Sequence, residues 1–191
     1  MKVHICLLIA LIGIVVASPV SAQRYFPGQK GLQLTGGLTD GRKGFEMSAG
    51  YSVYNAHKGH WLFNVEYLQR NYPYKLAQSS VSKDIPISQF TFESDYLLNM
   101  FDIGKVFFVN AGIGAQAGYE TVNWGSRLLD DGAIIRSSDR FIYGANTALE
   151  TETYLTDRVV LLVGVKERCL FGSTTGRFHT VIFAGFKFIL N

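Results

Sequence analysis

The chain has 191 residues, 48% of them hydrophobic, with a formal net charge of +3. These values are typical of one folded domain and exclude a disordered chain. Lys and Arg are scattered without a basic run, which argues against a nucleic-acid-binding protein. Gly (20), Phe (14) and Tyr (10) are abundant and Pro (4) is scarce, a balance that favours twisted sheets over packed helices.

Residues 1–22 have the order of a secretory signal peptide. Lys2 gives a charged start, residues 5–16 form an apolar run, and Val20-Ser21-Ala22 are the small residues of a cleavage site. The apolar run has about 12 residues, whereas a membrane-spanning helix needs roughly 20. An uncleaved anchor is the alternative, and the helix-breaking Pro19 disfavours it. We predict a mature chain that begins at Gln23.

The cysteines predict no disulfide in the mature chain. Cys6 lies inside the signal peptide, which leaves Cys169 without a second cysteine. No His partner is evident near Cys169 in the sequence, so we expect a small buried apolar residue rather than a catalytic thiol.

After residue 22 no apolar stretch reaches the length of a transmembrane helix, so a membrane role would be carried by strands. Eight segments alternate apolar and polar residues and end in turn-forming residues. They are residues 31–38, 45–54, 61–70, 88–99, 105–120, 141–155, 158–171 and 177–190. The sequence predicts one domain over 23–191, an all-β, single eight-stranded antiparallel up-and-down transmembrane β-barrel.

The contents of the two faces distinguish this barrel from a soluble sandwich. The apolar faces are aromatic and nearly uncharged, with Phe45, Trp61, Phe107, Tyr119, Phe141 and Tyr143 near strand ends as candidate interfacial girdles. The polar faces carry both signs: Glu46, Glu66, Glu93, Asp95, Glu120, Glu150 and Glu152 against Arg70, Lys166, Arg168, Arg177, His179 and Lys187. We expect a lipid-facing exterior around an interior of mutually neutralising charges that leaves no wide pore.

Loop lengths predict the orientation. Bacterial barrels place both termini and their short turns in the periplasm and their longer loops outside the cell. The second, fourth and sixth connections are short, at residues 55–60, 100–104 and 156–157. The external connections include the two longest, residues 71–87 and 121–140.

Three motifs that suggest chemistry have simpler interpretations. Residues 112–117 satisfy a dinucleotide-binding pattern, but they lie in a predicted strand with no helix after it, where glycines relieve crowding in a narrow barrel. His57 and His60 could be a metal pair, yet we interpret them as solvated turn residues because further ligands are missing nearby. Residues 172–176 lack the central Ser of a nucleophile elbow.

Some small outer-membrane barrels are acyl-chain hydrolases or transferases, so a Ser and His pair would be informative. His179 faces the predicted lumen with carboxylates available, but no Ser stands out as its partner. An interior charge network is the favoured interpretation over catalysis.

Several stretches, in order along the chain, resemble the conjugal transfer protein TraO family, which conjugative transposons of Bacteroidetes encode. They are residues 29–32, 118–123, 131–133, 141–144 and 152–158. The resemblance covers the whole mature chain and implies no catalytic residues, and we predict no cofactor-binding or metal-ligating residues. It implies a part of the DNA-transfer apparatus in the outer membrane, in contact with other conjugation proteins and with lipid.

We therefore expect a structural or docking component without enzyme activity, cofactor or direct nucleic-acid contact. A filled eight-stranded lumen is narrower than a nucleic-acid strand, so the barrel should not conduct DNA. Two alternatives remain: an adhesin or surface-protection barrel unrelated to conjugation, and a lipid-active barrel enzyme that depends on His179.

Overall fold

The computed structural model describes residues 26–40, 44–75, 82–104, 106–129, 132–136 and 139–190. The predicted signal peptide and its cleavage site lie outside this range. Eight strands and one short 3-10 turn, η1 (Asn123–Gly125), make up the described chain. The strands are β1 (Lys30–Thr39), β2 (Gly44–Tyr54), β3 (Gly59–Lys75), β4 (Ser82–Ile103), β5 (Phe107–Val122), β6 (Arg140–Tyr154), β7 (Val159–Phe171) and β8 (Phe178–Ile189).

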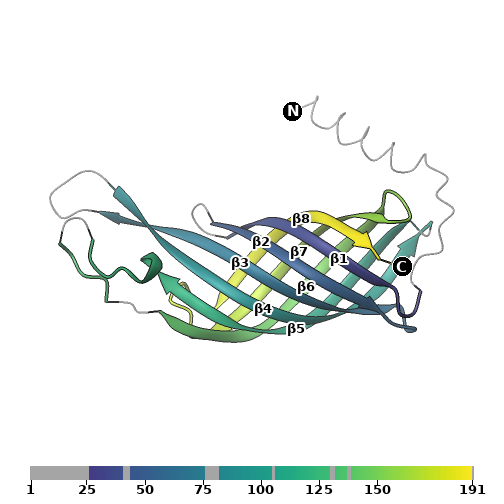
Figure 1. Ribbon diagram of the computed structural model, residues 1–191, viewed down its shortest axis with the longest axis horizontal. Coiled ribbons are helices and arrows are strands. Elements are labelled where there is room, and N and C mark those ends of the chain that lie inside the picture. Colours follow the sequence, from purple (N-terminus) through teal and green to yellow (C-terminus); the bar gives the residue numbers. More distant parts are fainter. Residues whose placement is uncertain are drawn as a thin grey trace, which may run out of the picture.

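Each strand pairs antiparallel with its neighbours in sequence, and β8 closes the sheet onto β1 (Figure 1). The predicted eight-stranded up-and-down barrel is therefore confirmed. Closure leaves no free sheet edge along the wall, which would otherwise expose unpaired backbone groups. Within the described residues, no helix has the length and hydrophobicity to span a bilayer.

Strands β3 and β4 are longer than predicted. Their ladder continues past Arg70↔Ile87 to Lys75↔Ser82, so much of the expected loop 71–87 is a projecting hairpin. The neighbouring strand β5 stops pairing with β4 at Ile87, and β2 stops pairing with β3 at Gln69. Each projecting strand thus has one partner, and such edge positions tolerate Pro73 and Pro86.

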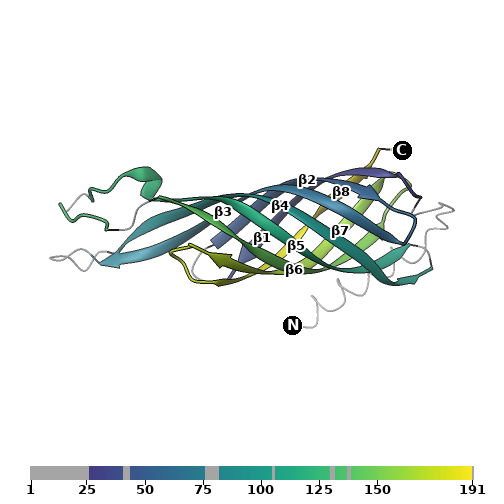
Figure 2. The ribbon, with the colours of Figure 1, turned by 90° about the horizontal axis from the view of Figure 1, so that it is seen from below.

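The barrel has two different ends (Figures 1 and 2). Lys30 and Ile189 lie at the same end as the short connections β2–β3, β4–β5 and β6–β7, and we call this the terminal end. The opposite end, the loop end, carries η1 and the projecting β3–β4 hairpin. This grouping of termini with short turns is the one that the sequence predicts.

The two faces of the wall are inverted relative to a soluble protein. Outward apolar side chains are widely exposed, with Leu38 at 72% and Ile113 at 70%, whereas Glu93 and Arg168 inside have no exposed surface. Outward aromatic rings pair near both ends of the barrel. At the loop end the ring centroids of Tyr67 and Phe90 lie 5.0 Å apart, and at the terminal end those of Trp61 and Tyr96 lie 5.0 Å apart. This is the arrangement of a transmembrane barrel.

One predicted interior residue lies elsewhere. Arg177 is exposed in the β7–β8 connection, with its guanidinium 5.9 Å from the Phe171 ring centroid. The prediction was wrong because β8 begins one residue later, at Phe178.

Glycines of β5 make room inside the wall. A Cβ on Gly114 would lie 1.6 Å from Asp95 Oδ1, and one on Gly112 would lie 2.7 Å from Leu97 Cγ. The glycines of residues 112–117 therefore relieve crowding between β4 and β5, as the sequence suggests, and the segment is strand throughout.

Candidate functional site

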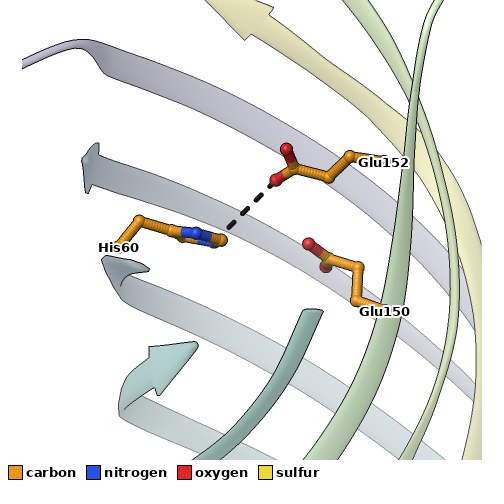
Figure 3. Close-up of side chains that lie close together, drawn as sticks. All are labelled: His60, Glu150 and Glu152. Carbon is orange, nitrogen blue, oxygen red and sulfur yellow. Dashed lines mark ion pairs between the residues drawn. The ribbon is translucent and has the colours of Figure 1, made fainter. Parts of the chain in front are cut away.

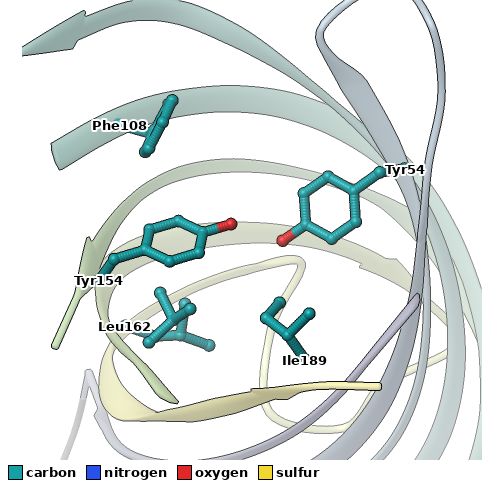
Figure 4. Close-up of a cluster of buried hydrophobic side chains, with 6 residues drawn as sticks. Tyr54, Phe108, Tyr154, Leu162 and Ile189 are labelled. Carbon is teal, nitrogen blue, oxygen red and sulfur yellow. The ribbon is translucent and has the colours of Figure 1, made fainter. Parts of the chain in front are cut away.

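An apolar cluster closes the lumen at the terminal end (Figure 4). Its members are Tyr54, Phe108, Tyr154, Val160, Leu162 and Ile189, which come from five strands. The Phe108 and Tyr154 rings meet edge to face at 5.5 Å. The Tyr54 hydroxyl donates to Glu152 Oε1 at 2.9 Å, which links this cluster to the charged layer above it.

That layer contains the buried side chains of His60, Glu150 and Glu152 (Figure 3) and the buried Lys187. His60 Nε2 lies 3.9 Å from Glu152 Oε1, and its ring stacks on Tyr54 at 4.7 Å. The interpretation of His60 as a solvated turn residue was wrong, although His57 is exposed in the turn. His60 has the same parity as Leu62 and Asn64, and extending the alternation of β3 back by one residue would have placed it inside.

His60, Glu150 and Glu152 each offer one ligand atom, and these atoms lie within 4.8 Å of one another. Such a set could hold a metal ion. Here the Lys187 ammonium contacts Glu152 and lies 3.7 Å from Glu150, so a cation of the chain already compensates both carboxylates.

A second ion cluster fills the middle of the lumen. The Lys166 ammonium contacts three carboxylates from three strands: Glu66, Glu46 at 3.3 Å and Glu93 at 3.0 Å. The Arg168 guanidinium binds Glu66 at 2.9 Å and donates from Nε to Gln116 Oε1 at 2.9 Å. These contacts cross the barrel, so strands distant in sequence are joined through its interior.

A small cavity lies within the charged interior. A cavity of about 20 Å³ lies beside this cluster, lined among others by Gln33, Asn64, Asp95, Lys166 and Phe183. A water molecule needs a cavity of about 10–15 Å³, so this one has room for about one water. The described interior is a polar core in which Lys166, Arg168 and Lys187 each pair with carboxylates.

The β7–β8 connection folds over the lumen at the loop end. Glu120 accepts hydrogen bonds from the Ser173 hydroxyl at 2.7 Å and from the Thr174 backbone N–H at 2.8 Å. Gln89 Nε2 also donates to Glu120, at 2.8 Å. Residues 172–176 carry no nucleophile elbow, but their hydroxyls attach this connection to a buried carboxylate, a role that sequence reasoning missed because Glu120 is more than 50 residues away.

His179 faces the lumen, as predicted, and is fully buried. Its Nε2 lies 3.2 Å from the Thr175 hydroxyl, which contacts the Ser173 hydroxyl at 2.8 Å. The hydroxyl neighbour that the sequence did not reveal is therefore a Thr four residues before His179. This chain of polar contacts ends on Glu120 and belongs to the same closure.

Cys169 differs from its prediction. It is half-buried on the outward face of β7, paired with Ala145 on β6 and Phe178 on β8, rather than in the core. Strand parity explains this position, because Arg168 and Leu170 on either side point inward.

Comparison with known proteins gives a family and a fold. The family model described as "Conjugative transposon protein TraO" matches residues 26–190. No curated protein matches the chain.

Three solved structures share the fold at low identity. Neisserial surface protein A aligns at TM-score 0.55 and 14% identity over 84% of this chain and 96% of its own. OprG from Pseudomonas aeruginosa aligns at 0.54 and 11% over 86% and 96%. Ail, the attachment invasion locus protein of Yersinia pestis, aligns at 0.52 and 10% over 86% and 100%. These likenesses support the barrel fold.

Proposed function

Because the chain belongs to the TraO family of conjugative transposon proteins, we propose that it is a non-catalytic anchoring component of a conjugative DNA-transfer apparatus. In this proposal the barrel sits in the outer membrane after export, with its terminal end in the periplasm. It contacts other proteins of the apparatus and outer-membrane lipid, and it binds no DNA directly.

The filled lumen is the observation that carries the anchoring role. Ion pairs through Lys166, Arg168 and Lys187 occupy the interior, and the apolar cluster and the β7–β8 connection cover its ends. A strand of DNA is wider than the interior of any eight-stranded barrel. A barrel with no room for cargo can still contribute a fixed position in the membrane and two ends for contacts.

The test combines location with transfer. The gene would be deleted from the mobile element and the deletion complemented with the full chain. The frequency of transfer to a recipient would then be counted. Membranes of the complemented donor would be fractionated and run on a heat-modifiability gel. We expect recovery in the outer membrane, a heat-shifted band and transfer lost on deletion and restored on complementation. Undiminished transfer in the deletion would overturn the role, and a soluble protein without a heat shift would overturn the anchoring.

An adhesin or surface-protection barrel is the second candidate, and the loop end favours it. Trp124, Leu128 and Ile134 are 61–71% exposed there, beyond the barrel wall. An adhesin would bind host cells or matrix without other transfer proteins. Binding by the complete chain in cells that lack the rest of the element, lost when residues 123–136 are replaced by a short linker, would support it over the transfer role.

A lipid-active enzyme is the third. It would depend on His179, so His179→Ala should abolish any acyl-chain release or transfer from outer-membrane lipid. The proposal predicts instead that a His179→Ala protein that still folds supports the same transfer frequency as the wild-type protein.

A further inference from the structure

Glu167 is the unusual residue of the barrel exterior. Its neighbours Lys166 and Arg168 point into the lumen, so strand alternation directs Glu167 outward, where it is half-buried. Among the described residues of β5 to β8, it is the only charged side chain on the outward face.

The carboxylate lies within the apolar band. On the side of the loop end, Phe171 lies four residues further along β7 and stacks on Tyr143, with ring centroids 5.7 Å apart, as part of an aromatic girdle. A strand rises about 3.3 Å per residue and tilts by about 40° in such barrels, which places Glu167 roughly 10 Å inside the girdle. The apolar band of an outer-membrane barrel is about 25 Å tall, and outward Val165, Val163 and Leu161 continue it below Glu167.

Hydroxyl-bearing residues flank Glu167 on the two neighbouring strands, whereas Val165 on its own strand and Ile182 on β8 are bulky. Thr147 on β6 and Thr180 on β8 are its direct register partners, and the Thr180 hydroxyl donates to Glu167 Oε2 at 2.5 Å. We call this surface the β6–β8 face; its small and polar members are Ala145, Thr147, Glu167, Cys169, Thr180 and Ala184, and the bulky Ile182 lies between the last two. The wall across the barrel, on β3 and β4, instead carries bulky Trp61, Phe63, Phe90 and Phe92.

Contact with lipid hydrocarbon alone is unfavourable for this carboxylate. An ionised carboxyl group offers about four acceptor sites, and one hydroxyl fills only part of them. Charged groups at bilayer depth are costly and usually pair or face a protein partner. A second copy of the chain would bring no complementary cation from its own β5 to β8 walls, because Glu167 is the only charged residue that points outward from their described parts.

We propose that the β6–β8 face is an intramembrane docking surface for a different protein, whose membrane-spanning segment places a Lys or Arg opposite Glu167. Small side chains let the backbone of such a segment approach closely, and the charge pair fixes its depth. The inference deepens the proposed function and rests on it only for the expectation that the partner belongs to the transfer apparatus.

Site-specific photo-crosslinking in donor cells that carry the complete element tests the surface. A photoreactive amino acid would replace Ala184 on the β6–β8 face or, as the matched control, Val65 on β3, which is outward on the opposite wall and 64% exposed. We expect an adduct from position 184 and none from position 65. Mass spectrometry should place the adduct on a membrane-spanning segment that contains Lys or Arg.

The same experiment would be repeated with Glu167→Leu and Glu167→Gln. Loss of one partner of a desolvated charge pair is expected to lower the yield of adduct more than about tenfold in Glu167→Leu, with a smaller effect in Glu167→Gln, which keeps the hydrogen bond. A heat-shifted band equal to wild type shows that both variants fold. An adduct with a second copy, an adduct with lipid alone, or an unchanged yield in Glu167→Leu would overturn the proposal.

The outcomes separate the two proposals. If deletion of the gene leaves transfer undiminished while the adduct depends on Glu167, the transfer role fails and the surface stands. If deletion abolishes transfer but the yield of adduct is the same in Glu167→Leu, the surface fails and the anchoring role stands.

Discussion

Replacing Lys166 by Met should destabilise the barrel more than any exposed charge change. Lys166 is 5% exposed and its ammonium contacts Glu46, Glu66 and Glu93, so its removal leaves three carboxylates beside one cation, Arg168. Removing one partner of a buried ion cluster costs about 3–5 kcal/mol, because the remaining charges stay desolvated. Such a cost lowers the ratio of folded to unfolded protein more than about 100-fold.

Reversible urea unfolding of the protein in lipid vesicles, followed by tryptophan fluorescence, measures this cost. Lys58→Met is the matched control, because Lys58 pairs with Asp102 at 3.4 Å with 71% of its side chain exposed, and exposed pairs contribute about 0–1 kcal/mol. Adding Glu46→Gln and Glu93→Gln to Lys166→Met should recover more than half of the loss, since the remaining Glu66 pairs with Arg168. The reasoning fails if Lys166→Met costs no more than Lys58→Met, or if the added substitutions recover nothing.

Four further outcomes follow from the packing and the topology. Gly118→Ala should lower the temperature of the heat shift, because its Cβ would lie 1.9 Å from the Phe90 carbonyl oxygen, whereas Gly36→Ala, with its nearest atom at 3.8 Å, should not. Glu120→Ala should speed proteolysis within residues 172–177 and leave the rest of the barrel protected, since those residues lose their buried acceptor. An epitope inserted at residues 76–81 should be detected on intact cells, and one inserted at residues 156–157 only after the outer membrane is opened. The purified protein in planar bilayers should give no persistent open conductance, because ion pairs through Lys166, Arg168 and Lys187 occupy the interior.

Alternation predicted the fold because it is a local property of each strand. Each of the eight predicted segments matches a strand, and the outward and inward residues of β2 follow the predicted parity from Phe45 to Val53. The alternation of apolar and polar residues did not predict strands where this local pattern was weak. The extension of β3 and β4 past Arg70 contains Pro73 and Pro86, and proline in a sequence normally predicts a turn or loop. Only the pairing of the two strands with each other reveals the extension.

The site was harder to predict than the fold because its contacts are distant in sequence. The charged residues of the lumen could be named from parity, but not which of them meet: Lys166 and Glu46 are 120 positions apart, and register around the whole barrel decides their contact. His60 was misplaced because the predicted strand began at Trp61, whereas β3 begins at Gly59. The sequence analysis did not single out Glu167, because its significance depends on Thr147 and Thr180 lying beside it on neighbouring strands.

The interior and exterior of this barrel should respond to substitution in opposite ways. Inward polar groups such as Lys166 and Arg168 are engaged with one another, so changing them alters the free energy of unfolding but removes no surface that another protein can reach. Glu167 has the reverse position, since it stabilises the isolated barrel little in hydrocarbon and lies where a partner can reach it. Purified Glu167→Leu should therefore unfold at the same urea concentration as wild type or higher, while lumen variants that still fold should keep wild-type transfer frequency. Transfer frequencies and urea midpoints measured on the same set of variants would show whether the inward residues of β7 determine stability while its outward Glu167 determines transfer.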